Sequence, residues 1–163
     1  MKVLKFGGKS LASEQTFTNV IQIIKNKSKD SQLVVVVSAI GDTTDTLEEL
    51  ADLAKNNQEY QAAFKSFKAR SYHQGVDLEA ELQLLSKLFE GVSLIEDCTP
   101  KIKDLILAQG ELISSRVLAK HLNAAQLKAT EIDSRDFIVT DDCFGNAVVD
   151  EVLSKSKTQD YFN

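Results

Sequence analysis

The residues best suited to chemistry stand near the start of the chain, in the run Lys5-Phe-Gly-Gly-Lys-Ser10. Val3 to Phe6 predict a short buried strand, and the chain then turns through Gly7 and Gly8 into a helix expected to begin near Ser10. Because two glycines leave the backbone bare, the N–H groups of this turn can approach an anion closely, beside the cationic Lys5. The run predicts a phosphate-binding turn; the alternative is a plain turn with Ser10 as the helix cap.

The same run is not a Walker A loop. Gly8-Lys9-Ser10 looks like the end of that motif, but the motif requires another glycine five residues before its second one. That position is Val3, inside the predicted strand. The long loop that wraps phosphates in P-loop proteins is therefore excluded.

A second polar turn follows the next predicted strand. Leu33-Val-Val-Val-Val37 is a continuous β-branched run, which is typical of a parallel strand buried on both faces. It ends in Ser38-Ala-Ile-Gly-Asp-Thr-Thr44-Asp45. Because parallel strands end at the same edge of a sheet, we expect Ser38 and Thr44 to lie near the two glycines, where open α/β sheets bind ligands. The alternative is that Asp42 or a threonine only caps the following helix.

A third candidate lies inside a long predicted helix that begins at Thr99-Pro100 and runs to about Asn123. Gly110 interrupts it, at a cost of about 1 kcal/mol relative to alanine. The glycine indicates close approach of a ligand or another backbone, and Glu111 follows it directly. The alternative is a solvent-facing glutamate.

The remaining elements complete an α/β pattern. Apolar spacing predicts helices over 11–29, from about 43 and, as a helical insertion, over 58–97. Gln126 to Ile132 predict a third strand, followed by a short extended piece over 137–139, a turn, one more helix starting at about Val148, and a polar tail. We expect a mostly parallel sheet with helices on either side.

Composition sets further bounds. The 163 residues are 43% hydrophobic and 26% charged with a net charge of −5, which indicates one soluble domain and no general binding of nucleic acid or anionic membranes. No apolar stretch approaches a membrane span, so we expect a cytoplasmic protein. Cys98 and Cys143 are expected to be reduced structural thiols, and His73 and His121 to have surface or packing roles.

Four motifs in register resemble aspartokinases. They are the opening run, the turn 38–45, Gly110-Glu-x-x-Ser-Ser115, and Asp133-x-Arg-Asp-Phe137. The run Phe137 to Asn146 is most similar to the kinase portion of bifunctional aspartokinase–homoserine dehydrogenases. The resemblance implies an amino-acid-kinase fold, a three-layer αβα sandwich, of which residues 1–163 form the N-terminal substrate- and phosphate-binding lobe.

The resemblance also implies a reaction. Such enzymes use Mg²⁺ and ATP to phosphorylate the side-chain carboxylate of L-aspartate, the first step toward lysine, threonine and methionine. Lys5 would neutralise the transferred phosphoryl group, as the catalytic residue, and Gly7, Gly8 and Ser10 would line its path. Substrate contacts would come from Ser38, Thr44, Glu111 (through the aspartate ammonium) and, more weakly supported, Arg135.

Two features depart from the family pattern. Lys9 stands where threonine usually follows the double glycine. The family's nucleotide-binding half should follow residue 163, so we expect most ATP and Mg²⁺ contacts outside this chain, no metal ligands within it, and no activity of the chain alone. The full-length protein is expected to be a homo-oligomer. Two alternatives remain: a glutamate- or carbamate-type kinase, and a non-catalytic domain that binds an amino acid or anion.

Overall fold

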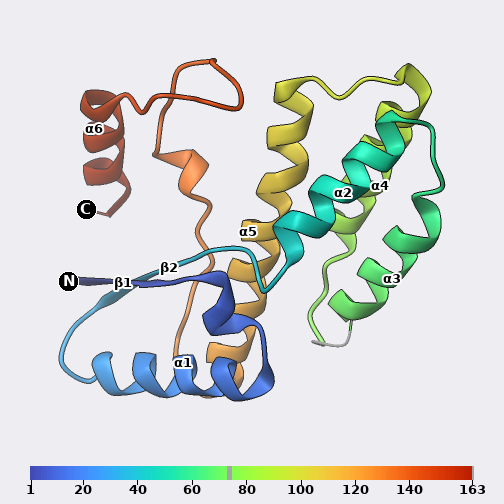
Figure 1. Cartoon of the computed structure of the whole chain (residues 1–163). Helices are drawn as coiled ribbons and strands as arrows, with labels where there is room; N and C mark the ends of the chain where they lie inside the picture. The colour runs from blue at the N-terminus through green and yellow to red at the C-terminus, as the bar shows by residue number, and fades with distance from the viewer. Residues whose placement is uncertain (73–74, 163) are drawn as a thin grey trace.

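The computed structural model describes residues 1–72 and 75–162 (Figure 1). Its elements in chain order are β1 (Lys2–Phe6), the 3-10 helix η1 (Gly8–Leu11), α1 (Glu14–Lys27), β2 (Leu33–Val37), α2 (Thr43–Lys55), α3 (Gln61–Tyr72), α4 (Glu79–Ile95), α5 (Pro100–Ala124), the 3-10 helix η2 (Ser134–Asp136) and α6 (Glu151–Phe162). The predicted α/β class is confirmed. None of the described helices is long and apolar enough to cross a membrane.

The two strands form a parallel pair joined through α1, as the sequence predicts. Their register places Lys5 opposite Val36. One face of the pair packs on α1 and α5, in a cluster that includes Val20, Leu118 and Leu122. On the other face Val36 is 45% exposed and Val3 is 65% exposed. The prediction that β2 is buried on both faces is therefore wrong for this structure, because helices cover only one face.

The α-helix after the first turn begins later than predicted. Gly8–Leu11 form a 3-10 helix, and α1 starts only at Glu14. Ser13, not Ser10, is its N-cap: the Ser13 hydroxyl accepts a hydrogen bond from the Thr16 backbone N–H, and the Thr16 hydroxyl accepts one from the Ser13 N–H. This reciprocal capping box satisfies two N–H groups at once, which explains why the helix starts there.

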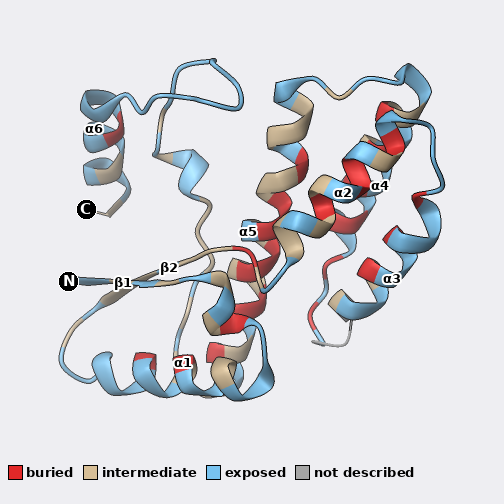
Figure 2. Cartoon of the chain, in the orientation of Figure 1, coloured by how far each residue is buried: buried red, intermediate tan, exposed pale blue. Residues whose placement is uncertain are grey.

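The main core lies among α2, α3, α4 and α5 (Figure 2). Leu47, Leu50 and Ala54 of α2 are buried, as their spacing predicts, and they pack with Phe89 of α4. α3 and α4 occupy most of residues 58–97. α5 begins at its predicted signal, since the Thr99 hydroxyl accepts a hydrogen bond from the Ile102 N–H and Pro100 takes the first helical position.

The third predicted strand is absent from the described chain. Residues 127–132 form neither a helix nor a strand, and Gln126 before them has a φ of +62°. The Asn123 side chain instead bonds both the N–H and the carbonyl of Ala129, so an amide takes the place of a neighbouring strand. The segment packs through Leu127 and Ala129 on the cluster beneath the sheet.

Residues 137–162 form a C-terminal arm (Figure 1), which contacts the start of α5 where the Gly145 N–H donates to the Asp104 carboxylate. Thr140 and Val149 make an isolated antiparallel bridge. The bridge holds Val149 outside the last helix, which starts at Glu151 rather than near Val148 and continues through the expected polar tail to Phe162.

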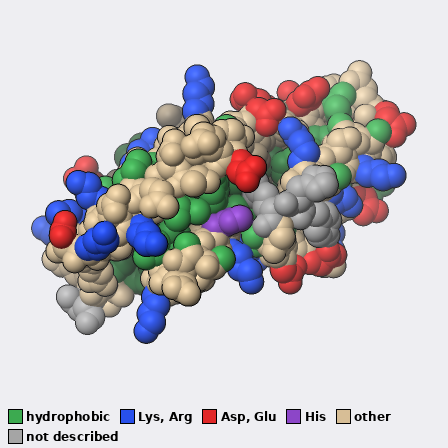
Figure 3. All heavy atoms as spheres, turned by 90° about the horizontal axis from the view of Figure 1, so that it is seen from below, with side chains coloured by type: hydrophobic (Ala, Val, Ile, Leu, Met, Phe, Trp, Pro, Cys, Tyr) green, Lys and Arg blue, Asp and Glu red, His purple; other side chains and the backbone are tan. Residues whose placement is uncertain are grey.

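His121 has a packing role. Its ring lies edge-on to Phe17 with the centroids 4.9 Å apart. Figure 3 shows a histidine side chain at the surface, with hydrophobic side chains on one side of it. His73 lies outside the described residues.

Candidate functional site

Three sequence-predicted segments meet where the two strands end. The Ser38 N–H donates to the Phe6 carbonyl at 3.2 Å, and the Gly41 N–H donates to the Gly8 carbonyl at 3.1 Å. From the other side, the Ala39 N–H donates to Glu111 Oε1 at 3.2 Å. We call this meeting point the junction: the turn 38–43 held between Gly8 and the Gly110-Glu111 pair of α5.

Two glycines make the junction tight. A Cβ at Gly8 would lie 2.3 Å from the Ala39 carbonyl oxygen, closer than atoms can approach. A Cβ at Gly110 would lie 2.9 Å from the Ala39 Cβ and 3.3 Å from Cγ2 of Thr43. Both glycines are therefore required by protein packing. The close approach expected at Gly110 is made by side chains of the turn.

Gly7 differs from its neighbour. A Cβ on Gly7 would meet nothing within 4 Å, so the residue borders open space. The Ser10 N–H donates to the Gly7 carbonyl at 2.9 Å, which closes the short 3-10 turn. Lys9 is exposed on this turn. The turn thus keeps one bare glycine toward solvent, as a backbone anion site requires.

The segments that carry the predicted polar side chains lie near the end of the strand pair. Lys5 is exposed on β1, one residue before Phe6, and Ser38 follows β2 directly. Thr44 is half-buried in the first turn of α2, and Glu111 is exposed although one of its oxygens is held by Ala39. The structure therefore brings the segments that carry these residues together.

The alternative for the turn 38–45 was that Asp42 or a threonine only caps the following helix, α2. Asp42 occupies the N-cap position of α2, but its side chain makes no capping hydrogen bond. It pairs instead with Arg70 of α3 at 3.5 Å. The Thr43 hydroxyl donates to the Ile40 carbonyl at 2.6 Å, so Thr43 closes the turn.

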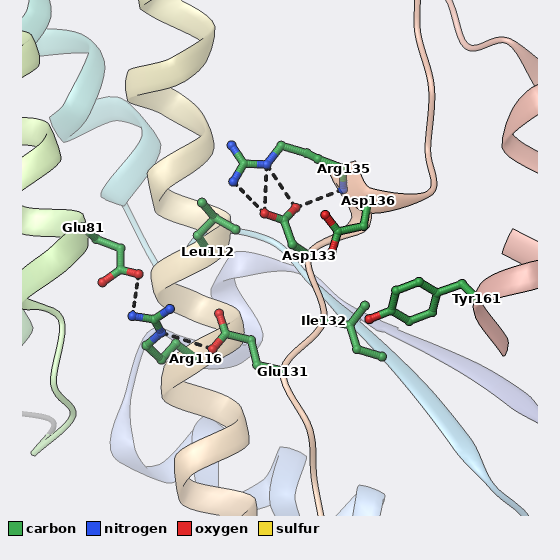
Figure 4. Close-up of a pocket in the computed structure, with 9 residues that line it drawn as sticks. All are labelled: Glu81, Leu112, Arg116, Glu131, Ile132, Asp133, Arg135, Asp136 and Tyr161. Carbon is green, nitrogen blue, oxygen red and sulfur yellow. Dashed lines mark hydrogen bonds and ion pairs between the residues drawn. The ribbon is translucent and has the colours of Figure 1, made fainter. Parts of the chain in front are cut away.

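Arg135 lies in a different place. Its guanidinium donates to both carboxylate oxygens of Asp133, with the shortest contact at 2.6 Å (Figure 4). These hydrogen bonds hold the pKa of Asp133 below its usual range, and they raise the pKa of Arg135. The pair borders a cavity of about 350 Å³ between α5 and residues 131–136. Within the described chain the guanidinium is therefore engaged by its neighbour.

A second arginine in this cavity escaped the sequence analysis. Arg116 of α5 contacts Glu81 of α4 at 2.6 Å and Glu131 at 3.1 Å. Both glutamates lie far from Arg116 along the chain, so no local motif predicts these ion pairs. One oxygen of the buried Glu81 has no hydrogen-bond partner among the described residues. In Figure 4 that carboxylate lies on the far side of Arg116 from Asp133.

No group of three or more metal-ligating side chains occurs among the described residues. The junction and the neighbouring residues Lys5, Ser38 and Thr44 carry backbone N–H groups, one ammonium, two hydroxyls and one carboxylate. This set is suited to a small ligand with an anionic and a cationic group.

The chain belongs to the amino acid kinase family, whose model matches residues 1–163. Among its relatives, the bifunctional aspartokinase/homoserine dehydrogenase of Buchnera aphidicola (subsp. Acyrthosiphon pisum, strain APS) is 26% identical over 98% of this chain and 22% of that protein. Aspartokinase 2 (chloroplastic) of Arabidopsis thaliana is 32% identical over 89% of this chain and 29% of that protein. The chain thus spans about a quarter of the length of these relatives.

A solved structure has the same fold. Aspartokinase III of E. coli, in complex with aspartate and ADP, superposes with a TM-score of 0.85 at 22% identity, over 99% of this chain and 37% of that one. The family and the aspartokinase fold implied by the four sequence motifs are therefore confirmed.

Proposed function

We propose that this chain is the substrate- and phosphate-binding lobe of an aspartate kinase. The reaction transfers the γ-phosphoryl group of ATP to the side-chain carboxylate of L-aspartate and yields 4-phospho-L-aspartate and ADP. The proposal is supported by the junction, where the glycine turn, the turn 38–43 and Glu111 meet, and by Lys5, which precedes the glycine turn on β1. The names of the relatives add the substrate.

The chemistry suits these groups. An aspartate carboxylate is already a nucleophile, so transfer needs charge neutralisation and alignment more than a general base. The Lys5 ammonium neutralises the phosphoryl group in transfer, while Gly7, Gly8 and Ser10 form its path. The open space beside Gly7 supports this assignment.

The substrate is held by the opposite wall of the junction. Glu111 Oε1 is taken by Ala39, which leaves Oε2 to accept the aspartate ammonium. Ser38 and Thr44 contribute hydroxyls. Arg135 is a weaker candidate for the substrate carboxylate, because binding there would require it to leave Asp133.

Residues outside this chain supply most contacts to adenine and to Mg²⁺ in this proposal, and the chain alone is expected to show no turnover. The full-length protein is proposed to be a homo-oligomer. Cys98 and Cys143 are both free, which fits the reducing cytoplasm.

The test is aspartate-dependent ADP release from Mg²⁺-ATP by the full-length gene product. Lys5→Ala is expected to lower kcat at least about 100-fold, as loss of one charge-stabilising group does elsewhere. Lys2→Ala is the matched control, since Lys2 is an exposed lysine on the same strand. Equal activity of the two variants contradicts the role of Lys5.

A substrate panel separates the alternatives. Phosphorylation of glutamate or carbamate in preference to aspartate identifies another amino acid kinase. Aspartate binding by calorimetry without turnover in the wild-type full-length protein identifies a binding domain, and Lys9→Thr then tests whether the unusual lysine silences the site.

A further inference from the structure

We propose that Gly110 and the Oε1 atom of Glu111 are positioning groups that set the place of the turn 38–43 against the phosphate-binding turn. The inference rests on the proposed function and deepens it. Gly110 touches no substrate in this scheme. It acts through Ala39, and Glu111 has a second task beside binding an ammonium.

The first support is the fit around Gly110. This residue is fully inside the protein, and its missing side chain is replaced by the Ala39 methyl group and the Thr43 methyl group. A Cβ at Gly110 would collide with the Cβ of Ala39, and the backbone N–H of Ala39 is itself bonded to Glu111. Because α5 is a long helix packed on α2 and α4, the turn is the part that must move.

The second support is the path by which such a movement spreads. Glu111 fixes the N–H of Ala39, and two residues later the N–H of Gly41 fixes the carbonyl of Gly8. The backbone of Gly41 has a φ of +59°, which only glycine adopts readily, so the conformation that makes this connection depends on a glycine at this position. A shift imposed at Gly110 therefore reaches the turn that is proposed to carry the phosphoryl group.

The third support is that the two oxygens of the Glu111 carboxylate have different roles. Oε1 holds the turn at 3.2 Å from Ala39, and the exposed part of Glu111 leaves Oε2 accessible. A substrate ammonium on Oε2 is thereby linked through a single rigid group to the turn 38–43. The assignment explains why the glycine and the glutamate stand next to each other on the helix.

The first experiment is Gly110→Ala in the full-length enzyme. A misplacement of about 1 Å costs about 100-fold in rate, so we expect kcat/KM for aspartate to fall by about that factor. Gly91→Ala is the matched control: Gly91 also lies in a helix, but a Cβ there meets nothing within 4 Å. It receives the same gain in helix propensity and should keep its activity.

The rescue is Gly110→Ala combined with Ala39→Gly, which removes the 2.9 Å conflict while keeping the backbone N–H. The double variant should recover at least about 10-fold in kcat/KM relative to Gly110→Ala, since the turn returns to its place. Loss of activity in Gly110→Ala that Ala39→Gly does not restore overturns the proposal, as does unchanged activity in Gly110→Ala.

Glu111 is tested by comparing two replacements. Glu111→Gln keeps an oxygen for Ala39 but loses the charge, so KM for aspartate rises while kcat stays near wild type. Glu111→Ala loses both, so kcat falls as well. Equal kcat in the two variants overturns the positioning role of Oε1.

Hydrogen exchange separates this proposal from the proposed function. In the wild-type full-length protein the amides of residues 39 and 41 should be protected, and Gly110→Ala should speed their exchange at least about 10-fold while Gly91→Ala leaves it unchanged. Fast exchange without aspartate kinase activity in the wild type contradicts both proposals. Protected amides that respond as expected in an inactive protein retain the positioning role and reject only the kinase assignment.

Discussion

The junction and the C-terminal arm use their residues in opposite ways. At the junction, small residues bring three backbones together, and Ala39 is only 4% exposed. In the arm, large apolar side chains remain in solvent, with Val148 65% and Val152 84% exposed. Both regions carry motif residues of the same family, but packing in the arm is limited to a small aromatic cluster of Phe137, Tyr161 and Phe162.

The contrast in packing between the junction and the arm shows how glycines and apolar residues should be interpreted in this sequence. Glycines in the junction serve protein packing first, and a ligand can only use what packing leaves open. In the arm, Val148, Val152 and Leu153 show helical spacing but remain exposed, so their periodicity predicts a helix but not a buried face. Stability should therefore respond to the helical core and the junction, and very little to the arm.

The largest difference in stability is expected between alanine replacements of one leucine in the core and one leucine in the arm. Leu47 is fully buried in α2 and Leu153 is 43% exposed in α6. Leu47→Ala should lower the free energy of unfolding by about 3 kcal/mol through lost burial and a cavity, whereas Leu153→Ala should cost less than about 0.5 kcal/mol. Urea unfolding followed by circular dichroism measures both. Similar losses would show that the arm is as well packed as the core.

The two neighbouring glycines of the first turn come next. Gly8→Ala should lower the free energy of unfolding by about 2 kcal/mol, because the new methyl group meets the Ala39 carbonyl and the turn must shift. Gly7→Ala is the control for stability, since it enters open space. Thermal unfolding of the two variants measures both losses of stability. A larger loss from Gly7→Ala would contradict the packing described for the junction.

Local signals predicted the junction well because each of its parts is coded by adjacent residues. A β-branched run, a glycine turn and Thr99-Pro100 each specify their own element, and parallel pairing then forces the strand ends together. The start of α1 was missed by four residues, since Ser10 and Ser13 are both acceptable caps and only Ser13 has a reciprocal partner at Thr16.

Elements that depend on distant partners could not be predicted from the sequence. The apolar alternation of 126–132 is typical of a strand, but the Asn123 side chain engages Ala129 where a ladder was expected. The sequence makes Arg135 a weakly supported candidate for the substrate carboxylate, and its pairing with Asp133 could not be predicted from the sequence. Arg116 joins residues from three segments, which no spacing rule reveals.

Arg116 and Arg135 of the cavity should contribute differently to the free energy of unfolding. Arg116→Ala should cost about 1.5 kcal/mol, because it leaves the buried Glu81 carboxylate without its partner. Arg135→Ala should cost less than about 0.5 kcal/mol, as its ion pair is local and more than half of its side chain is exposed. The combined variant Arg116→Ala/Glu81→Leu should regain part of the loss, since no unpaired charge remains. Failure to regain any of it would mean that Arg116 acts through Glu131 alone.

The smallest effect is a difference in pH dependence at Asp133. Hydrogen bonds from Arg135 lower the pKa of this carboxyl in the folded chain, so the folded state favours the ionised form. Its contribution to stability is therefore complete above the unfolded-state pKa of about 3.9 and disappears as the pH falls below that value through the folded-state pKa. Asp133→Asn removes this dependence, so its free energy of unfolding, measured in urea between pH 6 and about 2.5, should fall less steeply below about pH 4 than that of the wild type. Asp150→Asn is a suitable control, because Asp150 caps the exposed helix of the arm without an ion pair among the described residues. A wild-type profile that runs parallel to that of Asp133→Asn would show that Arg135 is free in solution, and would reopen its assignment as a ligand for the substrate carboxylate.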